Sequence, residues 1–351
     1  MPSSKKKLGQ FYTTNYDYIL NGMTIPEEVN TIVEPFAGMG DLLKFTPRSN
    51  KYTLELYDID PKTPDITKRD SLKSPPCYDN KFILTNPPYL ARNKTPDKEL
   101  YDLYKQNDLY KCFIRTLINS NPSGGILILP LNFICSIRNL DITLRREFLI
   151  KFQITKINIF EENVFEDTSY SVCSLIFNLR QNENFNISID IFPSNKKINI
   201  TLDKHNNFTI GYELYKLPIL DTLVIQRATK TTNKNLFTTN ILLCCIDSNS
   251  KNKLGFKIID TSEKDKYIDN TKNLSNRSHA LIVLNKHPDI DKQKTLVNKL
   301  NEFIENNRAK YYSLFLTNYR ESSDIARKRI SFDLAFRILN HVFTQLEPIE
   351  P

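Results

Sequence analysis

The chain has 351 residues, of which 40% are hydrophobic and 25% charged, and its formal net charge is +8. This length suggests about two domains, and the apolar share is large enough for buried cores, which excludes a disordered protein. The longest apolar stretch, residues 125–135, is interrupted by Pro130 and has about half of the ~20 residues that a transmembrane helix needs.

The first residues, 1–7, are followed by no apolar segment, so we expect no secretory signal. The six cysteines show no Cys-x-x-Cys spacing and only four histidines are present, so we expect free thiols and no metal site. These features predict a soluble protein that is located in the cytoplasm or the nucleus. Glycine is scarce, 8 residues against roughly 25 at average usage, so clustered glycines should answer a backbone requirement.

The first 180 residues alternate short β-branched runs with helix-like segments. This alternation is typical of an α/β domain, and it predicts a Rossmann-like, doubly wound, mostly parallel sheet. The predicted strands are 31–34, 53–59, 82–85, 126–129, 154–159 and 171–179, and the main helices are 98–119 and 139–151.

The pattern changes after residue 186, where 187–191 and 198–202 predict antiparallel strands outside the βαβ series. We therefore expect a domain boundary near Phe208, with domains 1–208 and 209–351. Apolar residues at helical spacing in 296–304 and 332–346, with Ser331 as an N-cap, predict a smaller mixed α+β domain. Residues 212–351 carry 22 basic and 16 acidic side chains, a net charge of +6, so they hold most of the excess positive charge.

Two of the eight glycines, Gly38 and Gly40, follow a predicted strand that ends at Glu34. Glycine permits positive φ and lets a ligand approach the backbone closely. The third glycine of the dinucleotide fingerprint is absent, so a pyrophosphate ligand is not indicated. This turn alone fits a nucleotide-like ligand and a plain tight turn equally well.

Two acids follow at informative distances. Asp58 ends the next strand, 20 residues after Gly38, where a doubly wound sheet places the carboxylate that binds ribose hydroxyls. Asp70 ends a short third strand and could accept a hydrogen bond from an adenine amino group. The alternatives are a solvated strand end for Asp58 and a helix N-cap for Asp70.

The most specific segment is Asn86-Pro87-Pro88-Tyr89, at the end of a predicted strand. An amino group conjugated to a ring is a poor nucleophile, because its lone pair is delocalised. The Asn86 side-chain oxygen and the Pro87 carbonyl can each accept one N–H bond, which favours tetrahedral nitrogen and frees the lone pair. Tyr89 offers a flat face on which a flipped base could stack. The segment therefore indicates transfer of a methyl group to an amino nitrogen.

In these motifs and their order, the first 180 residues resemble the γ-type adenine-N6 DNA methyltransferases, which use S-adenosylmethionine. The resemblance implies the methyltransferase type of the Rossmann-like sheet, and catalysis at the tetrad after the adenine is flipped from the duplex. It also implies that Phe165 stacks on the flipped base opposite Tyr89, although ordinary core packing fits Phe165 equally well. Residues 108–111 and 128–130 are similar to the family's weaker motifs. The implied cofactor residues are Gln10, Phe11, Tyr12, Thr13, Glu34, Pro35, Phe36, Ala37, Gly38, Gly40, Asp58, Ile59, Asp70 and Ser71.

The same resemblance implies that a target-recognition domain follows the catalytic one, which here would be residues 209–351, with double-stranded DNA as the partner. Arginine can read guanine edges or bind phosphates, and the basic run near residue 320 predicts such contacts. A solvated loop is the alternative for this run, and an exposed loop for the two basic residues after the tetrad. The predicted DNA contacts are Arg92, Lys94, Arg320, Arg327, Lys328 and Arg329.

Other functions share the tetrad. The tetrad also resembles that of enzymes that methylate structural RNA bases or protein glutamine side chains. The glutamine enzymes, however, usually have their extra domain before the catalytic one. A DNA-binding subunit without activity is a third alternative, against which the intact glycine loop and tetrad argue. We therefore expect a site-specific adenine-N6 DNA methyltransferase, acting alone or beside a restriction endonuclease for the same site, with no membrane or metal partner.

Overall fold

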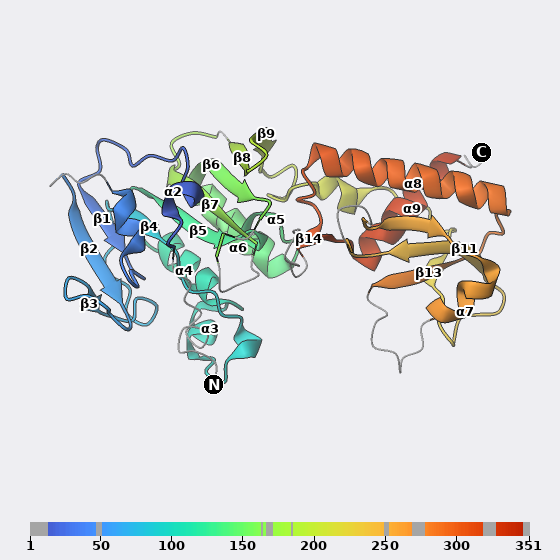
Figure 1. Cartoon of the computed structure of the whole chain (residues 1–351), viewed down its shortest axis with the longest axis horizontal. Helices are drawn as coiled ribbons and strands as arrows, with labels where there is room; N and C mark the ends of the chain where they lie inside the picture. The colour runs from blue at the N-terminus through green and yellow to red at the C-terminus, as the bar shows by residue number, and fades with distance from the viewer. Residues whose placement is uncertain are drawn as a thin grey trace. The chain divides into compact units, whose positions relative to one another are not determined.

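The computed structural model of the chain (Figure 1) describes residues 13–46, 51–162, 164–165, 171–183, 185–248, 253–268, 278–318 and 328–346. The chain divides into two compact units, Met1–Thr209 and Ile210–Pro351. This division lies one residue from the predicted boundary. Among the described residues, no helix is both long and apolar enough to cross a membrane.

The first unit is built on a nine-stranded sheet with the strand order β3-β2-β1-β4-β5-β7-β6-β8-β9. β7 runs antiparallel to both of its neighbours and β9 runs antiparallel to β8, whereas all other neighbouring pairs are parallel. The α/β fold class with a mostly parallel sheet is therefore confirmed. The strands are β1 Thr31–Glu34, β2 Thr53–Asp58, β3 Thr67–Lys68, β4 Phe82–Thr85, β5 Gly124–Pro130, β6 Phe152–Phe160, β7 Val172–Leu179, β8 Asn186–Phe192 and β9 Lys196–Thr201.

The helices differ from expectation at one place. The predicted helix 98–119 is two helices, α3 (Glu99–Tyr104) and α4 (Leu109–Ile118), because Lys105 adopts a left-handed φ of 53° that ends the first. The predicted helix 139–151 is α6 (Asn139–Lys151) as expected. α4 and α6 contact each other along the sheet (Figure 1), and a buried ion pair between Lys111 and Asp141 joins them. The short helices are α2 (Tyr16–Ile19) and α5 (Asn132–Cys135).

The strands β1, β2 and β4 bring the predicted site residues to one edge of the sheet. These strands are parallel neighbours, so the residues that follow them, among them Asp58 and Asn86, emerge at the same edge. The glycine loop is followed by a 3-10 turn, η1 (Asp41–Phe45). The residue that follows it, Thr46, is extended (φ −72°, ψ 134°), as expected of a residue before proline, and this ends the helical turn.

The predicted strands 187–191 and 198–202 do form an antiparallel pair, β8 and β9, but they are not separate from the main sheet. β8 pairs in parallel with β6, from Lys156↔Ser188 to Phe160↔Phe192. The alternating apolar residues Ile187, Ile189 and Ile191 are all buried, which explains why this hairpin extends the sheet.

The second unit is a four-stranded antiparallel sheet in the order β10-β13-β11-β12. Two long helices, α8 (Ile290–Lys310) and α9 (Phe332–Leu346), share one apolar core with one face of this sheet. Ser331 Oγ accepts a hydrogen bond of 3.2 Å from Leu334 N, as the N-cap prediction requires. The smaller α+β fold of this part is thereby confirmed. The other elements are β10 Ile225–Arg227, β11 Phe237–Cys244, β12 Gly255–Ile258, β13 His279–Leu284, β14 Thr317–Asn318, β15 Lys328–Arg329, α7 Lys264–Tyr267, η3 Tyr212–Lys216 and η4 Thr261–Glu263.

Candidate cofactor and catalytic site

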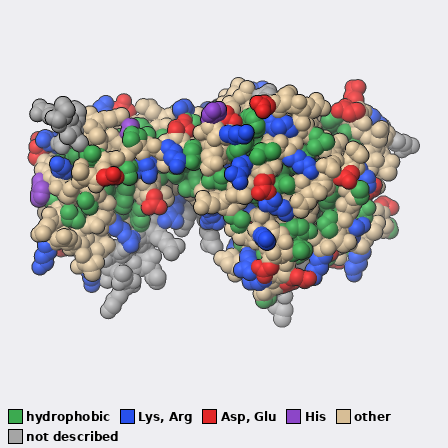
Figure 2. All heavy atoms as spheres, turned by 180° about the vertical axis from the view of Figure 1, so that it is seen from behind, with side chains coloured by type: hydrophobic (Ala, Val, Ile, Leu, Met, Phe, Trp, Pro, Cys, Tyr) green, Lys and Arg blue, Asp and Glu red, His purple; other side chains and the backbone are tan. Residues whose placement is uncertain are grey.

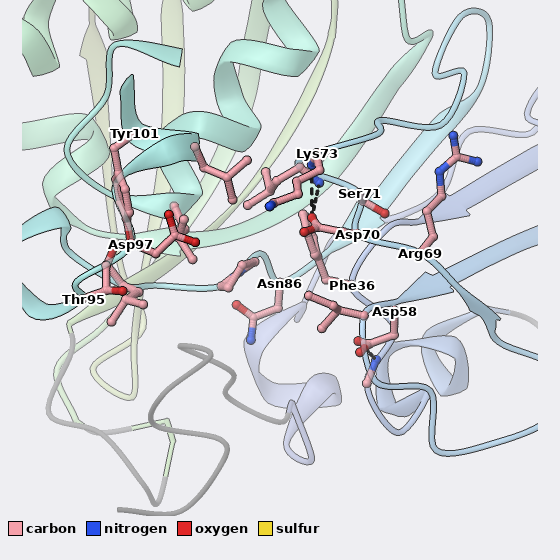
Figure 3. A pocket seen from close by; sticks show the side chains of 17 residues that line it. Phe36, Asp58, Arg69, Asp70, Ser71, Lys73, Asn86, Thr95, Asp97 and Tyr101 are labelled. Carbon is pink, nitrogen blue, oxygen red and sulfur yellow. Dashed lines mark hydrogen bonds between the residues drawn. The ribbon is translucent and has the colours of Figure 1, made fainter. Parts of the chain in front are cut away.

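A cavity of about 400 Å³ lies in the first unit, and Figure 3 shows the side chains that surround it. This volume is within the usual range for small-molecule sites. Its lining joins segments that are far apart in the sequence: the glycine loop, the end of β2, the turn after β3 and the tetrad. The predicted residues in the lining are Phe36, Gly38, Asp58, Ile59, Asp70, Ser71, Asn86 and Pro88, and the others are Arg69, Leu72, Lys73, Leu90, Thr95, Asp97, Leu100, Tyr101 and Leu109.

The glycine loop is held against the end of β2. Gly38 and Gly40 have φ of 56° and 75°, the left-handed region that glycine adopts readily. The N–H of Gly38 donates to Asp58 Oδ2 at 2.8 Å, and the N–H of Asp60 donates to Asp58 Oδ1, also at 2.8 Å. Asp58 therefore fixes the loop as well as lining the cavity.

Glu34 ends β1 behind this loop and is 2% exposed. Burial raises the pKa of its carboxyl well above the usual value, and the nearby charges of Asp58 and Asp41 raise it further. Glu34 Oε2 has no hydrogen-bond partner among the described residues. The cavity lining does not include the other predicted residues of this segment, Glu34, Pro35, Ala37 and Gly40.

The turn after β3 forms another part of the cavity wall. Asp70 Oδ1 accepts hydrogen bonds of 3.1 Å from the N–H groups of Leu72 and Lys73. Asp70 therefore caps a turn and also lines the cavity, but residues 69–81 contain no helix that it could cap. Ser71 is buried, and its Oγ has no hydrogen-bond partner within the described ranges. Ile59 contributes an apolar surface that is 42% exposed.

In the tetrad, the half-buried side chain of Asn86 lines the cavity and is held at both ends. Its Nδ2 donates to Thr13 Oγ1 at 3.1 Å, and its Oδ1 lies 2.5 Å from the Tyr89 hydroxyl. Pro88 lines the cavity, and Pro87 is buried. Of the N-terminal motif, Thr13 is thus brought to the tetrad, while Gln10, Phe11 and Tyr12 lie outside the described residues.

The structure does not bring Tyr89 or Phe165 to the cavity lining. Tyr89 is 2% exposed, its hydroxyl lies 2.7 Å from the carbonyl oxygen of Ile128, and its ring meets that of Tyr110 edge-on at 6.1 Å. Phe165 is 6% exposed. Stacking of a base between these two rings therefore stays a prediction.

Asp108 supports the tetrad from α4, a role that the sequence did not reveal. Its Oδ1 accepts a hydrogen bond of 3.1 Å from the N–H of Leu90, the residue after the tetrad. Burial raises the pKa of Asp108 to about 6, although Lys111 opposes the rise. The similarity of residues 108–111 to a family motif was the available signal, but it gave no function for the carboxylate.

The residues predicted to contact DNA differ in their exposure to solvent. Arg92 and Lys94 are exposed in η2 (Arg92–Lys94), and Arg92 forms an ion pair of 2.7 Å with Asp102. Lys328 is only 9% exposed, whereas Arg329, its neighbour in β15, is half-buried. Arg320 and Arg327 lie outside the described residues.

The acids of the site do not form a metal centre. Over the ranges that the structure describes, no group of three or more His, Cys, Asp or Glu side chains could hold a metal ion. All six cysteines are free thiols, and only Cys77 is exposed.

Three of the solved structures that resemble this chain are restriction or restriction-modification proteins. A modification subunit assigned to a type I restriction enzyme of Vibrio vulnificus is 15% identical, with a TM-score of 0.40 over 61% of this chain and 54% of that one. The methyltransferase subunit of a type I restriction-modification system of Streptococcus thermophilus is 16% identical, with a TM-score of 0.40 over 56% and 52%. The type IIG restriction endonuclease BpuSI is 14% identical, with a TM-score of 0.41 over 88% and 46%. This chain therefore spans about half the length of these solved chains.

A family comparison covers the centre of the first unit. Curated proteins give no match to this chain. The family model of the Eco57I restriction-modification methylases matches residues 56–165. The matched segment begins just before Asp58 and includes the tetrad and the 108–111 motif. Residues 56–165 are therefore similar to the restriction-modification methylases of the Eco57I family.

Proposed function

We propose that this protein transfers a methyl group from S-adenosylmethionine to the N6 amino group of an adenine that is flipped out of duplex DNA. One observation carries the proposal: Asn86 and Pro88 line the same cavity as Gly38, Asp58 and Asp70. A site for an amino acceptor and a site for a nucleoside are thereby next to each other, which methyl transfer between them requires.

The residues present fit the cofactor. Asp58 and Asp70 offer carboxylates for ribose hydroxyls and an adenine amino group, and Ile59 and Pro88 offer apolar surfaces for the base. Glu34 Oε2, at the end of β1 just before the glycine loop, is a buried polar atom without a hydrogen-bond partner among the described residues. S-adenosylmethionine would supply an electrophilic methyl group bound to a sulfonium.

In this proposal Asn86 makes the acceptor amino group nucleophilic. Its Oδ1 has two lone pairs, so it can accept from the adenine amino group while the Tyr89 hydroxyl remains 2.5 Å away. The Pro87 carbonyl accepts the second N–H. No strong base is needed beforehand, because the nitrogen becomes acidic as its new bond forms.

The second unit is the proposed DNA-recognition domain. Its support is the charge balance of residues 212–351, with 22 basic and 16 acidic side chains. On the face seen in Figure 2, Lys and Arg side chains are interspersed with Asp and Glu and do not form one patch. Charge on this face therefore does not locate the DNA surface, and Arg320, Arg327 and Arg329 remain the residues proposed to contact it. A restriction endonuclease for the same site is proposed as partner, because the matched family model is of the restriction-modification type.

The proposal is tested with labelled S-adenosylmethionine and separate panels of DNA, structural RNA and protein. We expect label in DNA only, and none with the Asn86→Ala variant, which should still bind the cofactor. Label in RNA alone, with none in DNA of high sequence diversity, would overturn the DNA assignment. Label in protein would point instead to a glutamine acceptor. Near-wild-type turnover of Asn86→Ala would overturn the amino-activation role.

A further inference from the structure

Helix α3 connects the two sides of the cavity through two tyrosines. Tyr101 and Tyr104 lie three positions apart on this helix, so they are neighbours on its surface. The Tyr101 hydroxyl donates to the carbonyl oxygen of Leu90 at 2.9 Å. The Tyr104 hydroxyl donates to the carbonyl oxygen of Leu72 at 2.6 Å. One tyrosine thus contacts the residue after the tetrad, and the other contacts the turn that Asp70 caps.

Two ion pairs repeat this arrangement. Asp102 pairs with Arg92, two residues beyond Leu90, at 2.7 Å. Glu99 pairs with Lys73, the residue after Leu72, at 2.8 Å. Both pairs are exposed, so each contributes little alone. They nevertheless show that α3 contacts the same two segments along its whole length.

The segments that α3 holds belong to the cavity wall. Leu72, Leu90 and Tyr101 line the cavity. Tyr101 is 3% exposed and Tyr104 is half-buried. Burial raises the pKa of both hydroxyls, so both remain protonated donors at neutral pH.

We propose that α3 sets the separation between the Asp70 turn and the tetrad, with Tyr104 and Tyr101 as its two positioning residues. Tyr104 fixes the turn at Leu72 that would hold the adenosine part of the cofactor. Tyr101 fixes Leu90, the residue that follows the tetrad. The inference rests on the proposed function of the cavity. Separation matters because misplacing reacting groups by ~1 Å lowers a rate about a hundredfold.

The test uses Tyr101→Phe and Tyr104→Phe, which keep the ring and remove only the hydroxyl. Cofactor affinity is measured by calorimetry without nucleic acid, and turnover at saturating cofactor on the acceptor that the unchanged protein methylates. Loss of one hydrogen bond predicts about fivefold weaker binding for Tyr104→Phe, and a fall in kcat as well, because the turn that would hold the cofactor shifts relative to the tetrad. Tyr101→Phe should keep its affinity and lose about fivefold or more in kcat.

Tyr215→Phe is the matched control. Its hydroxyl donates to the carbonyl oxygen of Phe315 at 2.6 Å in the second unit, so it loses the same kind of bond away from the cavity. Cofactor affinity equal to the control in Tyr104→Phe, or a fall in affinity in Tyr101→Phe as large as its fall in kcat, would overturn the inference. An unchanged protein that binds cofactor but methylates RNA alone would overturn the proposed function, while the binding result for Tyr104→Phe would still decide the inference. Absence of cofactor binding by the unchanged protein would overturn both.

Discussion

Asp58 at the end of β2 accepts a hydrogen bond of 2.8 Å from the N–H of Gly38, in the loop that follows β1. Two features that are 20 residues apart in the sequence are therefore one structural feature. The carboxylate holds the glycine loop in position, and the loop in turn keeps the carboxylate at the cavity wall. Substitution of Asp58 should consequently affect the loop and the cofactor together.

Asp58→Ala should weaken binding of S-adenosylmethionine about tenfold or more, because a ribose acceptor and the anchor of the loop are both lost. Calorimetry measures this directly. Asp60→Ala is the matched control, since the Asp60 side chain pairs with Lys62 and its backbone N–H, which donates to Asp58, is kept in the variant. Equal affinities for the two variants would show that the ribose assignment is mistaken.

Gly40→Ala should lower the free energy of unfolding by about 1 kcal/mol, because alanine is strained at a φ of 75°. Its Cβ would also lie 3.2 Å from Leu43 Cδ1. Gly22→Ala imposes a similar strain at a φ of 66°, outside the glycine loop, and its Cβ would displace Lys156 Nζ, the flexible end of a side chain, from 2.5 Å. Chemical denaturation should show a similar loss in both variants, whereas cofactor affinity should fall only in Gly40→Ala. A fall in both would mean that the loop has no special role.

Thr13→Val should lower kcat about fivefold and leave cofactor affinity unchanged. Thr13 Oγ1 lies 3.1 Å from Asn86 Nδ2, and a threonine hydroxyl can donate or accept, so it can hold the amide in either orientation. Valine keeps the shape and removes one hydrogen bond, whose net contribution is about 1 kcal/mol. Thr13→Ser restores the hydroxyl and should recover most of the rate. If Thr13→Ser is as slow as Thr13→Val, shape rather than the hydrogen bond sets the rate.

Asp108→Asn should remove a pH dependence of stability. Burial raises the pKa of Asp108 from 3.8 to about 6, so the folded chain binds this proton more tightly than the unfolded chain does. The contribution of Asp108 to stability is therefore complete below about pH 4 and is lost as the pH rises through 6, by up to about 3 kcal/mol. The asparagine oxygen can still accept from Leu90 N.

Urea denaturation of both proteins between pH 4 and pH 7 measures this difference, since other titrating groups cancel. The stability of the variant relative to the unchanged protein should increase across this interval. A constant difference would show that Asp108 does not titrate there.

Much of the first unit follows from local patterns. The strands at 31–34, 53–59 and 82–85 are predictable because their β-branched runs end in polar residues, and Asp58 and Asn86 lie at the ends of two of them. A parallel sheet then brings such residues to one edge. The sequence could not show that residue 105 divides the predicted helix 98–119, because a left-handed lysine leaves no pattern of its own.

The parts that the sequence did not reveal depend on contacts between distant segments. The bond from Asp108 to Leu90 N and the two bonds of α3 involve backbone groups, which residue identity does not indicate. Lys328 was predicted from charge to contact DNA, yet it is only 9% exposed. Net charge does not distinguish a buried lysine from an exposed one.

The central claim concerns the base that is modified, and analysis of nucleosides tests it most directly. DNA of high sequence diversity is incubated with the protein and S-adenosylmethionine, digested to nucleosides and analysed by mass spectrometry, with Asn86→Ala in parallel. We expect N6-methyldeoxyadenosine with the unchanged protein and none with the variant. N4-methyldeoxycytidine, or no methylated nucleoside in DNA while structural RNA is methylated, would contradict it.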